Sequence, residues 1–483
     1  MTEEAAQPAG RYPLAAMTAI VLASLVVLMD TTFIVLSLPA IADDLDARGG
    51  GAEWAITAFL MATGVAQIGA GWAAERFGQR RVFLGASAAF GVFAVAVAAS
   101  PGLVWLIVAR CLQGLCAGLM IPMATSLAFG MFPPGRRATA VGMSGTVVML
   151  GPLIAPLLSG WVLGFATWRW LVLLDLVLVL AVLGFGWARL PNLLERRRRP
   201  FDGVGLALLA GGLAALLVAL AQADDWAVVV SFAIGAVGVG LLLLYGGHAR
   251  RTAHPLIDLS IFAAPGFTVV MGIVASVSVA QFARTVFVPL ELQALRGLSA
   301  LETGLALLPS AFAAAVAMPV AGRWTDRAGG RTPVTVGLVL AVTSSAALGL
   351  LQLDTPLPVI VSLLVVNNVG IVLCSMPVTV MGLSAVAPRR VPQAAALRTL
   401  TRQVSGALGT AVLATIITAQ AGHLTLASAD TSDLDQAQQA YNVGFLVSAA
   451  IAGVGLVLAR KLPADNSVRS TPERDEEETW LTS

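Results

Sequence analysis

The chain has 483 residues, of which 58% are hydrophobic and only 12% are charged. An average soluble domain is about 25% charged. This composition and the mean hydropathy of +0.86 therefore exclude a soluble enzyme, a nucleic-acid-binding protein and a secreted disulfide scaffold. The net charge of +2 is uninformative by itself, whereas the positions of the charges say more.

Apolar segments follow one another along the whole chain, and each is long enough to cross a hydrocarbon layer about 30 Å thick as an α-helix. The fourteen segments are residues 14–41, 54–74, 82–100, 103–129, 138–165, 168–190, 203–222, 227–247, 266–291, 301–322, 333–353, 356–381, 392–420 and 441–460. The first is too long for a cleavable signal peptide and is interrupted by Asp30. We therefore predict an all-α polytopic membrane protein with 14 spans.

The charges in the loops indicate how these segments are oriented. If the N-terminus is cytoplasmic, the inner loops and termini hold 22 of the 29 basic residues, and the outer loops hold only Arg48 and Arg296. An excess of Arg and Lys is typical of cytoplasmic loops, so both termini are expected in the cytoplasm. Because all basic residues except Lys461 are Arg and the chain is rich in Ala and Gly, we expect a bacterial cytoplasmic membrane.

One loop sequence occurs twice, with every matching residue offset by 251 positions. The first copy consists of Gly71, Glu75, Arg76, Gly78 and Arg80. The second consists of Gly322, Asp326, Arg327, Gly329 and Arg331. The acidic residue of each copy is expected to accept N–H groups at a helix N-terminus or to pair with an Arg, which would form a conformational latch. A solvated turn is the alternative.

The repeat indicates two parallel six-helix halves, with two helices inserted between them. We predict a cytoplasmic N-terminus at 1–13 and a first bundle at 14–190. Cytoplasmic linkers with the two extra helices are predicted at 191–261, and a second bundle at 262–461. The polar segment 462–483 is predicted to be a disordered cytoplasmic tail.

Three ionisable residues are predicted deep inside the first half. Asp30 lies about 16 Å from the end of its segment at the helical rise, and Arg110 and Asp175 lie seven residues into theirs. Charged groups at such depth are costly and usually functional. A guanidinium keeps its proton and needs an anionic partner, so we predict that Arg110 exchanges between the two carboxyl groups during proton coupling. A static ion network is the alternative.

Segment 138–165 combines small residues with prolines at Gly151, Pro152, Pro156 and Gly160. Small residues allow helices to approach closely, and prolines bend a membrane helix. We predict a tight seam between the two halves here, with generic packing as the alternative. Gln113, which is close to Arg110 in the sequence, is predicted to face the seam or the substrate.

Weaker site candidates are Arg284, Glu291, Asn367, Asn368 and Arg402. Arg284 and Glu291 are seven residues apart and would pair poorly, whereas the two Asn residues could bond either a ligand or a neighbouring helix. Arg402 is predicted to be an anchor at the inner membrane surface, with a site role as the alternative. The Cys and His residues match no metal or redox spacing, and the chain has no phosphate-binding loop. No metal or other cofactor is therefore expected.

Taken together, these motifs resemble the major facilitator superfamily, and specifically its fourteen-span drug:proton antiporters, over residues 14–461. The resemblance lies in Asp30 to Pro39, Gly71 to Arg81, Arg110 to Gly114, Gly151 to Gly160, Trp168 to Trp170, and Gln293 to Gly297 with Pro309. It implies export of small amphipathic drugs, often cationic, by alternating access, driven by protons in a monomer. It implies no enzymatic activity and no nucleic-acid partner.

The sequence also departs from that family pattern. Glu75 replaces the usual Asp, Val35 replaces the usual Asn, and Asp175 stands where an Asn is common. The extra carboxyl group predicts a second proton site at Asp175. The alternatives are a proton-coupled exporter of an endogenous metabolite or lipid and a membrane scaffold or sensor that has lost transport.

Overall fold

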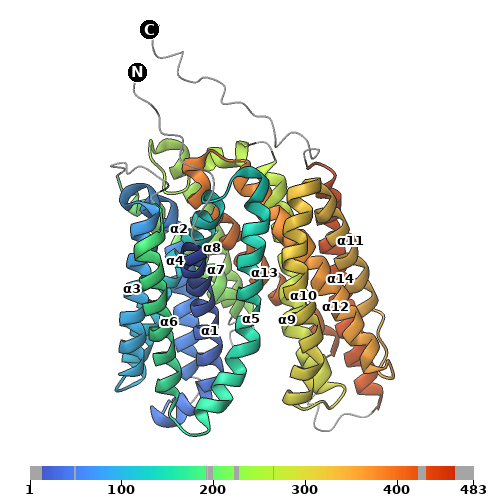
Figure 1. The fold of residues 1–483 in the computed structure, drawn as a ribbon. Coiled ribbons are helices and arrows are strands. Elements are labelled where there is room, and N and C mark those ends of the chain that lie inside the picture. Colours follow the sequence, from blue (N-terminus) through green and yellow to red (C-terminus); the bar gives the residue numbers. More distant parts are fainter. Residues whose placement is uncertain are drawn as a thin grey trace, which may run out of the picture.

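The computed structural model describes residues 14–47, 51–191, 193, 200–221, 228–264, 266–421 and 431–462, and every regular element in these ranges is a helix (Figure 1). The first six α-helices are α1 (Leu14–Asp44), α2 (Trp54–Phe77), α3 (Gln79–Ala98), α4 (Leu103–Gly130), α5 (Arg137–Leu163) and α6 (Trp168–Arg189). Next come α7 (Gly203–Ala221) and α8 (Val228–Arg251). The last six are α9 (Phe267–Ala294), α10 (Ala300–Ala328), α11 (Arg331–Leu348), α12 (Leu357–Ser384), α13 (Val391–Ala421) and α14 (Thr431–Ala459). Short 3₁₀ helices occur at Gly51–Glu53, Pro134–Arg136, Leu259–Ala263 and Pro388–Arg390.

The apolar segments form these helices because lipid offers no hydrogen bonds, so each backbone must satisfy its own N–H and C=O groups. By length and composition, eleven of the helices in the described residues can cross a membrane. The predicted count of fourteen spans therefore stays a prediction. The predicted N-terminus 1–13, the basic run 196–199 and the tail from 463 lie outside the described residues.

The largest difference from the predicted segments is at α14, which begins ten residues before the predicted apolar run. Its first turns carry Asp433, Asp435 and several glutamines. Because these residues are polar, they fall outside the apolar segment that predicts the helix. One of these glutamines, Gln438, is nevertheless buried and donates to Glu291 of α9 at 3.1 Å. The polar start of α14 is therefore held in the helix by a tertiary contact rather than by apolar character.

The two copies of the repeated loop form the same turn. Gly78 lies between α2 and α3 with φ of 88°, and Gly329 lies between α10 and α11 with φ of 81°. A side chain with a Cβ rarely adopts this conformation, so glycine is needed at both positions. We call the end of the molecule that carries these turns the inner end, and the opposite end the outer end.

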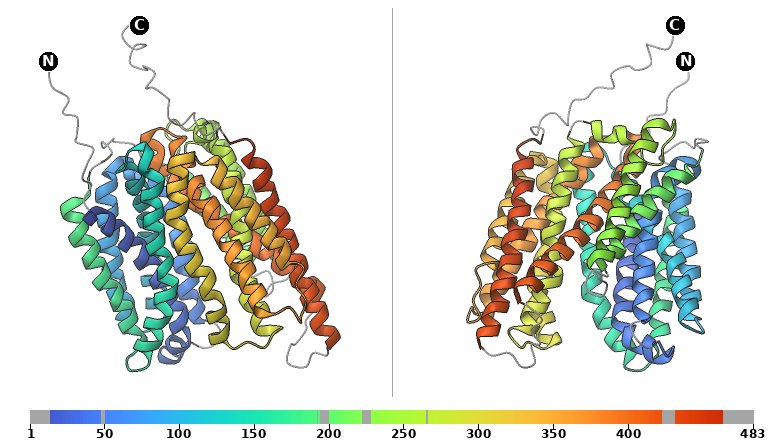
Figure 2. Two further views of the ribbon diagram at one scale, coloured as in Figure 1. Left: turned by 45° about the vertical axis from the view of Figure 1, so that its right-hand side comes forward. Right: turned by 180° about the vertical axis from the view of Figure 1, so that it is seen from behind.

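Helices α1–α6 form one bundle and α9–α14 form the other, as Figures 1 and 2 show. The bundles meet where α5 packs against α10 and where α13 packs against α2 and α4. They lie close together near the inner end and diverge toward the outer end (Figure 2).

The two inserted helices pack against each other, and α7 also packs against α2 and α13, one from each bundle. Leu213 of α7 and Ile68 of α2 belong to the same buried cluster as residues of α13. At the start of α7, Asp202 accepts hydrogen bonds from the backbone N–H groups of Gly205 and Leu256 and contacts His248 at 2.8 Å. Burial alone would raise the pKa of Asp202, but these contacts outweigh it and hold the pKa below its ordinary value.

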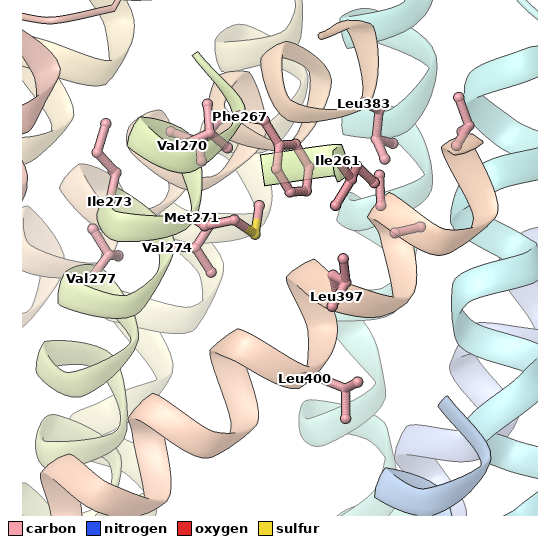
Figure 3. Packing of buried hydrophobic residues seen from close by; sticks show 14 of the residues in the cluster. Ile261, Phe267, Val270, Met271, Ile273, Val274, Val277, Leu383, Leu397 and Leu400 are labelled. Atoms are coloured by element: carbon pink, nitrogen blue, oxygen red, sulfur yellow. The ribbon is translucent and has the colours of Figure 1, made fainter. Parts of the chain in front are cut away.

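The apolar core of the second bundle is shown in Figure 3. Phe267, Val270 and Val274 of α9 pack with Leu397 and Leu400 of α13. Because the same cluster extends to α2 and α7, the second bundle, the inserted helices and part of the first bundle share one continuous core on this side.

Candidate functional site

A buried ion pair joins α1 and α4 inside the first bundle. The Arg110 Nη1 atom donates to both carboxylate oxygens of Asp30, at 2.9 and 2.8 Å. Asp30 is 0% exposed and Arg110 is 1% exposed. Burial strengthens the attraction between two charges because little water screens them, and removing either partner would leave an uncompensated charge.

The second helix of the bundle completes the surroundings of Arg110. Its guanidinium lies 4.2 Å from the centre of the Phe59 ring, and its Nε atom donates to the Ala55 carbonyl at 3.4 Å. The aromatic face attracts the cation. Sequence reasoning missed both residues because an apolar helix gives no signal for which Phe faces a distant Arg.

Gln113 belongs to the ion network rather than to a seam. It is 0% exposed, accepts from Arg110 Nη1 at 2.6 Å and donates to Asp30 at 3.2 Å. It therefore bridges the two charged groups and is inaccessible to a substrate in this state. The position of Gln113 one turn after Arg110 explains the contact, since residues three apart share a helix face.

Asp175 of α6 lies near this network without a donor of its own. Its side chain is 0% exposed, and in the described part of the chain neither carboxylate oxygen has a hydrogen-bond partner. It is close enough to Asp30 and Arg110 to interact electrostatically with both. The structure thus brings the three ionisable residues of the first half together, with one guanidinium beside two carboxyl groups.

This arrangement can store a proton and change contacts when it does so. Protonation of Asp30 would remove the charge that holds Arg110 to α1, whereas Arg110 keeps its own charge. Asp175 then offers a second acceptor on another helix. Protonation of Asp30 would therefore replace a contact between α4 and α1 with one between α4 and α6.

The second repeated loop connects the two halves at the inner end. Asp326 of α10 accepts hydrogen bonds from the backbone N–H groups of Ala138 and Thr139, at 3.1 and 2.7 Å. These donors are in the first turn of α5, where free N–H groups and the helix dipole favour an anion. Gly322 packs against the same turn, and a Cβ added there would lie 2.6 Å from the Ala138 carbonyl oxygen.

The first repeated loop makes similar contacts with the other half and with its own bundle. Gly71 approaches α13, where an added Cβ would lie 3.0 Å from Cβ of Gln393. Arg80 donates to the Trp187 carbonyl at the inner end of α6, within its own bundle. Arg331 of the second loop donates in the same way to the Arg460 carbonyl just after α14, at 3.3 Å. The glycine and arginine contacts of the two loops therefore correspond, as their turns do.

Two cavities lie beside the repeated loops. Arg76 lines one of about 580 Å³ on α2, α3 and α4. Arg327 and Asp326 line another of about 830 Å³, together with residues of α1 and α5. Glu75 is half-buried on α2, one residue before Arg76.

In this structure, α5 meets the other half at a different position from the seam that the sequence predicts. An added Cβ at Gly142 would lie 2.9 Å from the Met318 carbonyl oxygen of α10, so these two helices touch near their inner ends. Gly151 instead faces Leu25 of α1 within the first bundle, and Gly160 has no neighbour within 4 Å. Pro156 is exposed, and the side chain of Pro152 lies outside the described residues. In this structure the two helices meet near Gly142, and the predicted seam at Gly151 to Gly160 stays a prediction. Small residues occur along the whole helix, and the tilt between the bundles selects which ones meet.

Polar residues of α12 connect the helices of the second bundle. Asn367 donates to Ser344 and Ser345 of α11, at 3.0 and 2.9 Å. Of the two predicted partners, a ligand or a neighbouring helix, Asn367 therefore bonds the helix. Asn368 donates to the Ser310 carbonyl of α10 at 2.9 Å and accepts from Arg284 of α9 at 3.3 Å. Asn368 therefore links three helices.

The remaining candidates separate into two groups. Glu291 is buried and accepts from Gln438 of α14, so it does not pair with Arg284. The Arg402 guanidinium lies 6.0 Å from the centre of the Phe282 ring, in the middle of α9. This contact directs Arg402 into the second bundle rather than toward the inner membrane surface.

No group of three His, Cys, Asp or Glu side chains in the described residues could hold a metal ion. The three Cys residues are unpaired thiols, two of them buried. The polar groups that the structure gathers are instead those of the ion network, the Asp326 contact and the arginines of the second bundle.

Comparison with known proteins agrees with this architecture. The sequence model of the Major Facilitator Superfamily matches residues 20–410. The chain is 28% identical over 409 residues to the multidrug resistance protein B homolog of Mycobacterium tuberculosis, covering 83% of this chain and 76% of that protein. It is 28% identical over 413 residues to the tetracenomycin C resistance and export protein of Streptomyces glaucescens, covering 85% and 77%. The proton:xylose symporter XylE has a similar fold, with a TM-score of 0.64 and 13% identity over 93% of this chain and 95% of the symporter.

Proposed function

The chain belongs to the Major Facilitator Superfamily, and we propose that it is a proton-driven exporter of amphipathic drugs or antibiotics of the fourteen-span antiporter type. The buried Asp30–Arg110 pair with Asp175 beside it is the observation that carries proton coupling. Export is supported by relatives whose names describe multidrug resistance and antibiotic export.

We infer that the structure represents an outward-facing state. The inner ends of α5 and α10 touch at Gly142 and Gly322, and Asp326 bonds α5, whereas the two bundles diverge toward the outer end (Figure 2). A proton arriving from outside would neutralise Asp30 and free Arg110 to contact Asp175. We infer that the resulting shift of α1 relative to α4 breaks the Asp326 contact and opens the inner side to substrate.

The setting follows from the same considerations. The bias of basic residues toward one side supports a bacterial cytoplasmic membrane with both termini inside. We propose a monomer, as the family resemblance implies. The proton gradient supplies the energy, so the cycle needs no cofactor and no covalent chemistry.

The test uses inside-out membrane vesicles from cells that lack their major exporters. A pH-sensitive dye follows the imposed proton gradient while drugs and antibiotics of varied charge are added. We expect at least one compound to discharge the gradient with the wild type and not with Asp30→Asn. Asp354→Asn is the matched control, because Asp354 is exposed in the loop between α11 and α12.

Equal discharge by Asp30→Asn would remove Asp30 from the proton path. The same vesicles carrying Asp175→Asn would then identify the remaining carboxyl group. Absence of discharge with every compound, including extracts of endogenous metabolites, would contradict proton-coupled export. If only a metabolite discharged the gradient, proton coupling would be supported, and the substrate would be a physiological compound rather than a drug.

A further inference from the structure

The second bundle contains positive charges without matching carboxylates. Arg284 lies in α9, and Arg398 and Arg402 lie four residues apart on one face of α13. All three side chains are half-buried, and the Nε atoms of Arg284 and Arg398 are buried without an acceptor in the described residues. A guanidinium stays protonated even in this setting, so the charge must be compensated by something else.

The acidic side chains of α9 and α10 are engaged elsewhere, and α13 has none. Glu291 accepts from Gln438, and Asp326 accepts from the backbone of α5. Glu302 caps the N-terminus of α10 by bonding Ser299. Within the part of the chain that the structure describes, no ion pair joins Arg284, Arg398 or Arg402 to a carboxylate. Arg110 of the first bundle, in contrast, has a buried carboxylate partner in Asp30.

One of these arginines, Arg402, lies at the crossing of α9 and α13, and a second, Arg284, lies close to it along α9. An added Cβ at Gly406 of α13 would touch the Phe282 ring of α9, which places the crossing there. Arg402 is one turn before Gly406, with its guanidinium over the same ring, and Arg284 is two residues after Phe282. Arg284 is also oriented by Asn368, which is fixed to α10. Because α13 also packs against α2 and α4, this crossing lies beside the interface between the bundles.

We propose that Arg284 and Arg402, supported by Arg398, form a subsite for the negatively charged group of the exported compound. The proposal rests on the proposed export function and specifies its substrate class as amphipathic anions, such as aromatic carboxylates, sulfonates or phenolates. Planar guanidinium groups bind such oxyanions through paired hydrogen bonds. The Phe282 ring and the apolar faces of α9 and α13 would receive the aromatic body. This class differs from the cations that the family resemblance implies.

The test compares three probes on one scaffold, bound to the purified full-length protein in detergent micelles. The probes are 1-anilinonaphthalene-8-sulfonate, the uncharged N-phenyl-1-naphthylamine and a trimethylammonium derivative of the same ring system. Micelles without protein give the background fluorescence. We expect the sulfonate to bind about tenfold more tightly than either other probe, because a hydrogen bond to a charged group contributes that much.

Variants then assign the preference to the subsite. Arg284→Gln and Arg402→Gln should each remove the preference for the sulfonate and leave binding of the uncharged probe unchanged. Arg402→Lys keeps the charge and should retain part of the preference. Arg250→Gln removes an exposed charge at the end of α8 and should change nothing. The Lys variant and the wild-type preference remain decisive if a Gln variant does not fold.

Equal affinity for the three probes, or a preference for the cation, would overturn the subsite. So would an equal loss in Arg250→Gln, because that would show a general effect of net charge. Binding does not depend on proton movement, so the two proposals fail separately. Anion preference without substrate-induced proton movement in vesicles would contradict only the proposed function, and proton movement without anion preference would contradict only the subsite.

Discussion

The two bundles have related helices and turns but treat buried charge in opposite ways. In the first, Arg110 contacts Asp30, Gln113, the Ala55 carbonyl and the Phe59 ring. In the second, Arg284 has one amide oxygen as its acceptor at 3.3 Å. In the first, the guanidinium is paired with a carboxylate of the protein, whereas in the second the Nε atoms of Arg284 and Arg398 have no acceptor among the described residues.

The difference separates two tasks that a coupled transporter must perform. A network with its own carboxylates can respond to protons without any substrate present. Donors without an internal partner are available to a substrate, and occupying them changes the charge of the second bundle. Because charge inside a membrane is costly, each bundle would respond to its own ligand, and the contacts between α5 and α10 would connect the two responses.

The largest expected effect comes from breaking the complete network. Arg110→Ala leaves Asp30 buried without its cation, and we expect a loss of about 3–5 kcal/mol in the free energy of unfolding. Denaturation of the purified protein in micelles measures this loss. The double variant Arg110→Ala with Asp30→Asn should recover much of it, since the orphaned charge is then absent. A single variant as stable as the wild type would show that the pair is not desolvated.

In the second bundle, removing an arginine is expected to raise the free energy of unfolding rather than lower it. Arg402→Met removes a half-buried charge that has no carboxylate partner and keeps an apolar chain over the Phe282 ring. We expect stability without substrate to increase by about 2 kcal/mol, while the preference for anionic probes disappears. The same denaturation assay measures the first effect. Destabilisation by several kcal/mol would indicate that Arg402 has an internal anionic partner. The proposed difference between the two bundles would then be wrong.

The smallest of these effects concerns the contact between the bundles. Asp326→Asn removes the charge that binds the first turn of α5 and weakens two hydrogen bonds, so we expect the outward-facing state to lose about 1–2 kcal/mol. Spin labels at the inner ends of α5 and α10 would report a larger fraction of long distances. Glu302→Gln changes a carboxylate at the other end of α10 and serves as the control. An unchanged distance distribution would contradict the role of Asp326 as a latch.

Sequence reasoning located the helices and the repeated loop well because both leave a local signal. Apolar runs report burial or lipid exposure directly, and Gly78 and Gly329 are needed wherever the chain turns with positive φ. The start of α14 was missed because its polar residues are held by Gln438 and Glu291, which are far apart in the sequence. The depth of Asp30, Arg110 and Asp175 could be counted, but not the direction in which each side chain points.

By itself, the sequence determined that this chain is a helical membrane protein with two related halves and costly charges inside them, because hydropathy, charge bias and repetition are properties of the chain. Only the tertiary structure decided which small residues of α5 meet α10, that Gln113 bridges the ion pair, and that Arg402 faces Phe282. These contacts depend on the tilt and rotation of helices against one another. Those angles result from packing summed over many side chains, and no short segment of sequence encodes them.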